Sequence, residues 1–489
     1  MKVFEKYNSL NTGVKASLWF TIASLFQKGI SFIATPLYTR LLSTSEYGVF
    51  ATYNSWLSVI TIFATFNLSA GVMNNVLTKK ECFCISDKQV LSSFQVLEII
   101  TISLFSVAIL AFNHFFPRIL KVEQKALYLI CITVMANSGL SLLMTKEKYN
   151  YEYRSIVIIS IVSSLLIPIA NILFIVLGND NNYALVYGTT LVSIFIYVPV
   201  VLSNVFGGKH FIDRPLWKYA LSFNSPLLPH YLSLVILASS DRIMIERMQS
   251  SSEAALYSIP LGIVSIMSIF SAAINSSLIP ATYKRLKSEN YSGFSNYVSL
   301  ILLFFLTLSM LLMLLGPEAV YLMGGENYLV SKWVIPPVAG SVFFSFLYPL
   351  FANIEFYYEK KTVTTICSMG AAALNILLNY VFINMFGYLA AAFTTLFCYM
   401  LLACFHYIAF RKITHEKGIE GLYNVKIVFL LCVLVIILIA ISYVLYLHDV
   451  TRYITIGLVI TIGFIVLITK KHLFLCEYLV KKRIDVRDS

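Results

Sequence analysis

The stretch STSEYGVF, at Ser43–Phe50, returns as SSSEAALY at Ser250–Tyr257, 207 residues later. YEYRS at Tyr151–Ser155 returns as YEKKT at Tyr358–Thr362 with the same offset. Two further pairs follow in the same order at offsets of 204 and 205, NILF with NILL (171–174 and 375–378) and YALVYGTTL with YLAAAFTTL (183–191 and 388–396). Four matches in one order at nearly one spacing indicate that the chain holds two copies of one unit.

The composition is typical of a membrane protein. Of the 489 residues, 58% are hydrophobic and only 12% are charged, and the mean hydropathy is +0.80. A soluble core cannot use that much apolar surface, whereas a bundle of lipid-exposed helices can. In a membrane protein, two equivalent halves that move around a central site are typical of secondary transporters.

Apolar segments of about 20 residues, the length that spans a bilayer, recur along the whole chain. We expect an all-α polytopic protein with about fourteen transmembrane helices, in two six-helix lobes plus two C-terminal helices. The expected lobes are residues 1–214 and 215–415, and residues 416–489 hold the last two helices and a basic tail. The expected spans are 14–38, 48–73, 90–113, 125–144, 156–177, 184–206, 219–244, 255–280, 296–323, 333–354, 363–386, 388–410, 424–446 and 453–469.

The positive charges follow this topology. With both termini in the cytoplasm, 27 of the 36 Lys and Arg residues lie on the inner side and eight on the outer side. Such retention of positive charge inside is the usual rule for bacterial membrane proteins. The net charge of +12 is therefore topogenic and requires no nucleic acid. The polar N-terminal tail and long first apolar stretch predict no cleaved signal peptide.

The sequence carries no motif of a soluble enzyme. No expected loop exceeds about fifteen residues, and there is neither a GxxxxGK phosphate loop nor an HExxH metal motif. Cys82-x-Cys84 lies apart from any histidine, so it makes a poor metal site. We therefore expect neither a cofactor nor a bound metal.

One polar stripe runs along the first expected helix. Its members are spaced by three or four residues and so share one helix face: Ser17, Thr21, Ser24, Lys28, Ser31 and Thr35. Lys28 lies near the bilayer midplane, where a charge costs about 3 kcal/mol and must face water, a ligand or a partner. The stripe predicts one wall of a hydrophilic cavity, with Lys28 as a ligand-facing cation.

A second stripe follows on the next expected helix, where Asn54, Ser58 and Thr61 repeat the spacing. Small polar residues at this spacing also form helix–helix packing surfaces, and this alternative stays open for the serines and threonines. Lys28 has its own alternative as the partner of a buried carboxylate. The most nearly intramembrane carboxylate is Glu98, which could also reach the inner interface.

The seventh expected helix is irregular and polar. Pro226 and Pro229 predict a bend, and His230 and Ser233 follow within the span as cavity candidates. His230 is either a coupling residue that titrates near neutral pH or a hydrogen-bonded structural residue. Further along lie Asp241 and Arg242, read either as an interfacial ion-pair cluster or as part of an outer gate.

These segments resemble those of a known family. TPLYTRLLSTSEYGVF (35–50) and SSDRIMIERMQSSSEAALYSIP (239–260) are similar to the segments after the first and seventh helices of bacterial polysaccharide flippases of the Wzx type. Residues 355–396 are similar to the helix 11–12 region of the same family. This family belongs to the MOP superfamily with the multidrug and toxin extrusion (MATE) transporters. The resemblance runs from end to end and carries over most directly to Arg40, Glu46, Tyr47, Gly48, Asp241 and Arg242.

The resemblance implies a flippase in the bacterial inner membrane. Its cargo would be an undecaprenyl-pyrophosphate-linked oligosaccharide, such as an O-antigen or capsular repeat unit, moved to the outer leaflet by alternating access. Basic cavity residues such as Lys28 would bind the head group, and Arg40, Glu98, Asp241 and Arg242 are candidates for gating or for H⁺ or Na⁺ coupling. Implied partners are membrane lipids, a polysaccharide polymerase and a chain-length regulator. The alternatives are a lipid II-type flippase, a multidrug antiporter and a membrane polymerase.

Overall fold

The computed structural model describes residues 12–178 and 180–469, which contain helices and no strands. The first half holds α2 (Thr12–Leu41), α3 (Thr44–Thr65), α4 (Val72–Thr78), η1 (Lys80–Phe83), α5 (Asp87–Phe115), α6 (Pro117–Leu120), α7 (Gln124–Tyr149), α8 (Arg154–Leu177), α9 (Ala184–Gly208) and α10 (Arg214–Asn224). After η2 (Ser225–Leu227) come α11 (Leu228–Met248), α12 (Ser251–Val264), α13 (Ile266–Ser288), α14 (Phe294–Leu314), α15 (Gly316–Gly324), η3 (Glu326–Val334), α16 (Ile335–Tyr357), α17 (Lys361–Phe386), α18 (Tyr388–Glu416), α19 (Val425–Leu445) and α20 (Asp449–Thr469).

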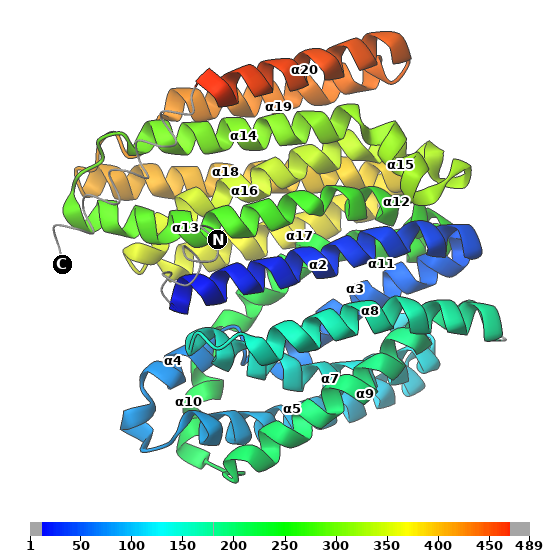
Figure 1. The fold of residues 1–489 in the computed structure, drawn as a ribbon, viewed down its shortest axis with the longest axis vertical. Helices are drawn as coiled ribbons and strands as arrows, with labels where there is room; N and C mark the ends of the chain where they lie inside the picture. Colours follow the sequence, from blue (N-terminus) through cyan, green and yellow to red (C-terminus); the bar gives the residue numbers. More distant parts are fainter. Residues whose placement is uncertain (1–11, 179, 470–489) are drawn as a thin grey trace, which may run out of the picture.

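The prediction of an all-helical membrane protein is confirmed. Eleven helical segments of the described residues are long and apolar enough to cross a membrane. The other three expected spans are helical as well, as α2, α3 and α20, and the total of fourteen crossings stays a prediction. The long helices run side by side along one direction (Figure 1), as helices that cross one bilayer must.

Two of the expected spans end earlier than the hydropathy indicates. α3 stops at Thr65 because Phe66 and Asn67 adopt left-handed backbone conformations, each with φ of 50°. The expected span 296–323 divides between α14 and α15, and Pro317 lies in the first turn of α15. A proline has no N–H to donate, so it favours the start of a helix over its interior.

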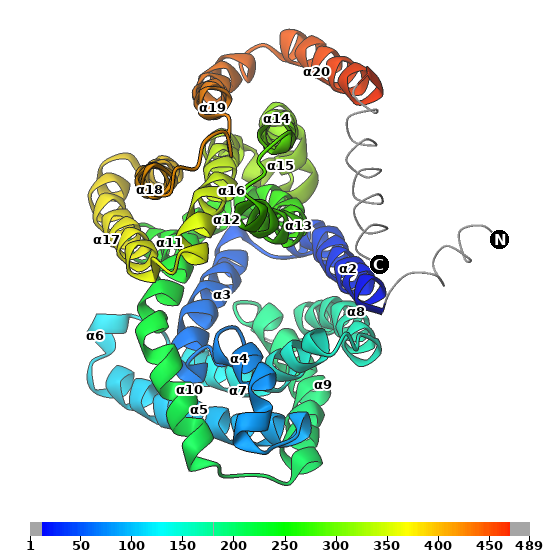
Figure 2. The same cartoon turned by 90° about the vertical axis from the view of Figure 1, so that its left-hand side faces the viewer.

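The helices fall into two groups that meet along a seam (Figure 2). The largest buried apolar cluster is built from residues of α11 to α19, between Ile245 and Ile439. Three smaller clusters are built from residues between Ala34 and Ala220. We call the two groups the N-group (α2–α10) and the C-group (α11–α18), with α19 and α20 packed outside the C-group. The lobe boundaries at residues 214 and 415 stay predictions.

The repeated sequences begin equivalent helices. Ser43 caps α3 and its hydroxyl accepts from the Glu46 N–H, while the Glu46 carboxylate accepts from the Ser43 N–H. Ser250 likewise caps α12 by accepting from the Glu253 N–H. Both starts carry a serine followed three residues later by a glutamate, the sequence pattern of a capping box, and the reciprocal pair of bonds is present in α3. We call the end of the bundle where α3 and α12 begin the distal end, and the opposite end the proximal end.

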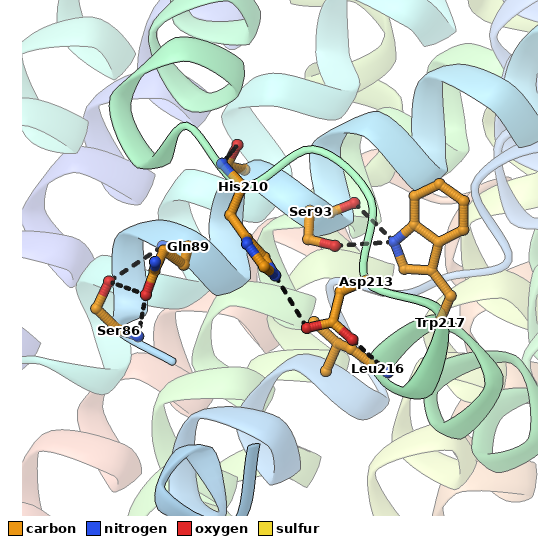
Figure 3. Close-up of polar contacts among 8 residues, drawn as sticks. Ser86, Gln89, Ser93, His210, Asp213, Leu216 and Trp217 are labelled. Carbon is orange, nitrogen blue, oxygen red and sulfur yellow. Dashed lines mark hydrogen bonds and ion pairs between the residues drawn. The ribbon is translucent and has the colours of Figure 1, made fainter. Parts of the chain in front are cut away.

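The connection between the groups is held at the proximal end (Figure 3). The Trp217 indole donates to the hydroxyl and the carbonyl of Ser93 on α5, at 2.9 and 3.2 Å. Asp213 accepts from the Leu216 N–H, which caps α10, and lies 3.0 Å from the His210 ring nitrogen. These contacts fix α10 to the N-group, and the chain then enters the C-group through the short η2 segment.

Candidate functional site

A cavity of about 120 Å³ lies in the seam between the two groups. α2 contributes Lys28, Ser31 and Thr35, and Tyr47 of α3 lies beside them. The C-group side is formed mainly by α12 and α13, with Ser258 and Ser265 as its polar members. Figure 2 shows why α2 can take this place, because it lies between α8 of the N-group and α13 of the C-group.

Lys28 is exposed in this seam. No aspartate or glutamate is among the described residues that line the cavity, and Lys28 forms no ion pair within the described ranges 12–178 and 180–469. The alternative in which Lys28 pairs with a buried carboxylate therefore finds no support in these contacts. A cation left in such a place favours an anionic ligand.

Most hydroxyls of the two stripes donate to carbonyls of their own helices. Thr35 donates to the carbonyl of Ser31, and Ser31 to that of Gln27, at 2.9 and 3.0 Å. On α3, Ser58 and Thr61 donate in the same way four residues back, and the Asn54 amide donates to the Phe50 carbonyl. None of these three α3 residues lines the cavity. Ser24 is exposed on α2, one turn closer to the proximal end.

A second cation lies near the cavity. Arg242 of α11 donates to the Ala238 carbonyl at 3.2 Å and is close enough to Tyr47 to interact electrostatically. Its buried Nε atom has no hydrogen-bond partner within the described residues. Because Tyr47 lines the cavity, Arg242 adds positive potential at the same seam.

Asp241, the neighbour of Arg242, points into the C-group and is 2% exposed. Its carboxylate accepts from the Tyr257 hydroxyl at 2.5 Å, the Thr395 hydroxyl at 2.7 Å and the Asn379 amide at 2.7 Å. These donors come from three different helices, α12, α17 and α18. The sequence alternatives placed Asp241 in an interfacial cluster or a gate, whereas the structure places it in a buried network of the C-group.

The same network includes Asn375, one turn before Asn379 on α17. Asn375 accepts from the Ser240 hydroxyl at 3.0 Å and donates to Thr395 at 3.1 Å. Both asparagines are fully buried. Their spacing of four residues puts them on one helix face, which is the sequence signal that could have joined them to Asp241.

The N-group carries a neutral counterpart of this network. Asn171, the repeat partner of Asn375, donates to the Tyr38 hydroxyl at 3.1 Å and accepts from Thr189 at 3.3 Å. These residues lie on α8, α2 and α9, which correspond to α17, α11 and α18 in the repeat. Two equivalent amide networks therefore exist, and only that of the C-group holds a carboxylate.

The remaining predicted residues lie elsewhere. The His230 ring is 2.9 Å from the Ser368 hydroxyl on α17, and Ser233 donates to the Pro229 carbonyl at 2.6 Å. Glu98 is fully buried in the N-group and does not reach an interface, and neither of its carboxylate oxygens has a partner within the described residues. Arg40 is exposed at the end of α2.

Comparison with known proteins decides the family. Residues 14–285 match the family model described as "Polysaccharide biosynthesis protein". The chain belongs to the polysaccharide biosynthesis protein family. This family assignment confirms the resemblance that the repeated segments indicated.

Two relatives of the chain come from different organisms. It is 21% identical to the "Probable low-salt glycan biosynthesis flippase Agl15" of Haloferax volcanii, over 78% of this chain and 80% of the relative. It is 27% identical over 179 residues to a protein of the Lsg locus of Haemophilus influenzae. That second match spans 36% of this chain and 44%, less than half, of the relative.

Solved structures give the fold. The chain resembles the lipid II flippase MurJ in its inward closed conformation with a TM-score of 0.67 and 14% identity, over 94% of this chain and 100% of MurJ. It resembles an inward-facing multidrug resistance MATE transporter of the MOP superfamily with a TM-score of 0.61 and 13% identity, over 83% and 99%. The chain therefore has the fold of these MOP-superfamily transporters.

Proposed function

We propose that this protein is a flippase that moves an undecaprenyl-pyrophosphate-linked oligosaccharide from the inner to the outer leaflet of the bacterial inner membrane. The observation that carries the proposal is Lys28, an exposed cation in the seam between two helix groups, in a cavity whose described lining holds no carboxylate. A charged, hydroxyl-rich head group cannot cross hydrocarbon without polar partners. The seam would supply those partners while the lipid tail stays in the bilayer.

Lys28 and Arg242 are the proposed ligands for the pyrophosphate, with Ser31 and Thr35 beside them. In the present conformation the cavity of about 120 Å³ is smaller than the roughly 300–1,000 Å³ of typical ligand sites. The groups must therefore separate to admit an oligosaccharide. Alternating access through rocking of the two groups provides that separation.

The distal end is closed in this conformation. Thr39 of α2 donates to the Met323 carbonyl of α15 at 2.6 Å, and Thr44 of α3 donates to Ser252 of α12 at 3.2 Å. Both bonds cross the seam. The positive-inside rule places this end on the outer side, so we assign the structure to an inward-facing stage of the cycle.

Among the predicted coupling candidates, the geometry favours Asp241. It is a carboxylate in a buried network of the C-group, and the equivalent network of the N-group is neutral. Binding of H⁺ or Na⁺ to Asp241 changes the charge of the C-group and leaves that of the N-group unchanged. This difference between the two groups would drive one against the other. His230 bonds a hydroxyl within the C-group, and neither carboxylate oxygen of Glu98 has a hydrogen-bond partner among the described residues.

The other predicted functions have less support from the site. A multidrug antiporter for cations would use carboxylates at the transport site, and none is among the described residues that line the cavity beside Lys28. A polymerase would need an extramembrane catalytic loop. A lipid II-type flippase shares every feature named and differs in the sugar. A polysaccharide polymerase and a chain-length regulator remain proposed partners, and both termini are proposed to be cytoplasmic.

The proposal is tested by deleting the gene and restoring variants. The measurement is the leaflet in which the lipid-linked repeat unit accumulates, together with surface polysaccharide. Lys28→Met removes the charge at similar length, Lys28→Arg retains it, and Lys284→Met makes the same change at an exposed lysine of α13.

We expect accumulation on the inner leaflet in the deletion strain, and the same after restoring Lys28→Met. Lys284→Met should restore wild-type polysaccharide, and Lys28→Arg should restore a measurable part of it. Normal surface polysaccharide in the deletion, with no other flippase present, would reject the proposal. Full restoration by Lys28→Met would reject the role given to Lys28.

A further inference from the structure

A second and larger cavity, of about 340 Å³, crosses the seam at the distal end. α3 contributes Trp56, and Lys121 and Glu123 come from the connection between α6 and α7. Tyr183 lies at the start of α9, and the C-group contributes Glu246 and Arg247 from the end of α11. Lys121 and Glu123 are exposed, so the cavity opens to the distal surface. Nothing in the proposed transport site uses it.

The two carboxylates of this distal cavity are oriented by hydroxyl donors. Tyr183 donates to Glu123 at 2.8 Å, and Ser251 donates to Glu246 at 3.1 Å. Each of these two bonds uses one oxygen of its carboxylate. The remaining oxygen of each is an acceptor of fixed direction, which is how sites recognise hydroxyl groups.

Arg247 joins the two groups here. Its guanidinium donates to the Leu120 carbonyl of the N-group and lies 4.9 Å from the centre of the Trp56 ring. Its Nε atom is buried without a hydrogen-bond partner among the described residues, and the hydroxyl of Thr52, which also lines the cavity, interacts with Glu246. A buried polar atom without a partner destabilises the closed form. A ligand with hydroxyl groups would supply the missing bond.

The charges of the lining residues restrict the class of ligand that the distal cavity can bind. Lys121 and Arg247 are balanced by Glu123 and Glu246, so the cavity has no net charge to attract a phosphate or an ammonium ion. The lining groups that can bind a neutral ligand are the planar carboxylates of Glu123 and Glu246, the planar guanidinium of Arg247, and aromatic rings such as that of Trp56. These groups match a sugar ring, which presents hydroxyls at its edge and C–H groups on its face.

We infer that the distal cavity is a binding site for an uncharged sugar unit. The volume of about 340 Å³ is at the lower end of the range for small ligands, which suits a short sugar segment. The identity of the natural ligand, the glycan on the outer surface, rests on the proposed function. The existence of the binding site rests on the geometry of the cavity alone. Because its walls come from both groups, the site is complete only while the distal end is closed. A sugar bound there stabilises the closed distal end and so favours the inward-facing stage.

The test uses the full chain in lipid nanodiscs and measures saturation transfer by NMR to defined probes. The probes are the methyl glycosides of glucose, galactose and N-acetylglucosamine, with glucose 1-phosphate and glucosamine as charged comparators. Thr52→Val and Glu123→Gln change hydrogen bonding with little change of shape, and Trp56→Ala removes the ring. Thr307→Val on α14 and Glu289→Gln beyond α13 are the matched controls.

We expect at least one methyl glycoside to bind, and each of the three cavity variants to bind it roughly tenfold more weakly or worse. Both controls should bind it like the wild type, and the charged comparators should bind more weakly than the glycoside. The inference is overturned if no glycoside binds at about 10 mM, if glucose 1-phosphate binds best, or if the cavity variants bind like the controls. Restoration assays with Lys28 variants report on flipping independently, so failure of the one proposal is distinguishable from failure of the other.

Discussion

Gly48 of α3 lies against the backbone carbonyl of Ser251 in α12, and a Cβ atom on Gly48 would stand 1.8 Å from that oxygen. The two residues belong to the two copies of the repeated sequence. The copies therefore meet across the seam at the distal end, where only a residue without a side chain permits the approach. The closure of this end depends on the absence of one methyl group.

Replacing Gly48 by alanine should open the distal end. The added methyl must displace backbone, which cannot yield as a flexible side chain does, so the conformational equilibrium should move away from the closed form. The distance between spin labels on the two sides of the seam should lengthen at the distal end. Gly29→Ala on α2, where a Cβ meets nothing within 4 Å, is the control. An unchanged distance distribution in Gly48→Ala would contradict this account of closure.

The Asn224 side chain should be important for stability. It is fully buried at the end of α10 and donates to the carbonyls of Phe66 and Asn67, at 2.8 and 3.0 Å. These two residues form the left-handed turn after α3. Asn224→Ala leaves both carbonyls without this donor, and we expect a loss of about 1–3 kcal/mol.

The measurement is thermal unfolding of the purified protein in detergent. Ser222→Ala is the control, because that hydroxyl is exposed and bonds the Tyr219 carbonyl of its own helix. Equal unfolding temperatures for the two variants would show that the turn after α3 does not depend on Asn224.

Asp241→Asn should uncouple flipping from the ion gradient that is proposed to drive it. The substitution keeps the shape of the side chain and removes the charge from the network of the C-group. Flipping by the protein in vesicles should lose its response to an imposed H⁺ or Na⁺ gradient, by at least about tenfold in rate. His230→Gln should keep the response, since the His230 ring bonds the Ser368 hydroxyl on α17 and not Asp241 within the described residues. A gradient response that survives in Asp241→Asn would remove Asp241 from coupling.

The pair formed by Lys125 and Asp180 at the distal surface should make a small, pH-dependent contribution. Lys125 donates to Asp180 at 2.5 Å, and this bond lowers the pKa of the Asp180 carboxyl. A carboxyl with a lowered pKa stabilises the fold above its unfolded pKa of about 3.9, and the stabilisation disappears as the pH falls through the folded pKa.

Asp180→Asn should therefore unfold more easily than the wild type at pH 6, and the difference should vanish as the pH falls through the lowered folded pKa of Asp180. The side chain of Asp180 is 37% exposed, so solvent limits the difference to about 0.2–1 kcal/mol. Unfolding temperatures measured across this pH range decide the matter, and a difference that stays constant with pH would contradict it.

Parts of the fold could be predicted because hydropathy and helix starts are local properties. A run of about 20 apolar residues predicts a helix wherever it packs, and Ser43 with Glu46 predicts the start of α3 from four adjacent residues. The end of α3 could not be predicted in the same way. The apolar run continues past Thr65, and the turn is fixed by Asn224, which lies 157 residues beyond Asn67.

The candidate site, like the fold, could be predicted only in part from the sequence. The sequence by itself determined the helices, the repeat, the family and the polar face that carries Lys28, because each depends on the order and spacing of neighbouring residues. Only the tertiary structure decided that Lys28 faces the seam, that Asp241 turns into the C-group, and that the two copies of the repeat meet at Gly48 and Ser251. These relationships depend on which faces of distant helices pack together, and one helix face with several polar residues is compatible with many neighbours until packing selects one.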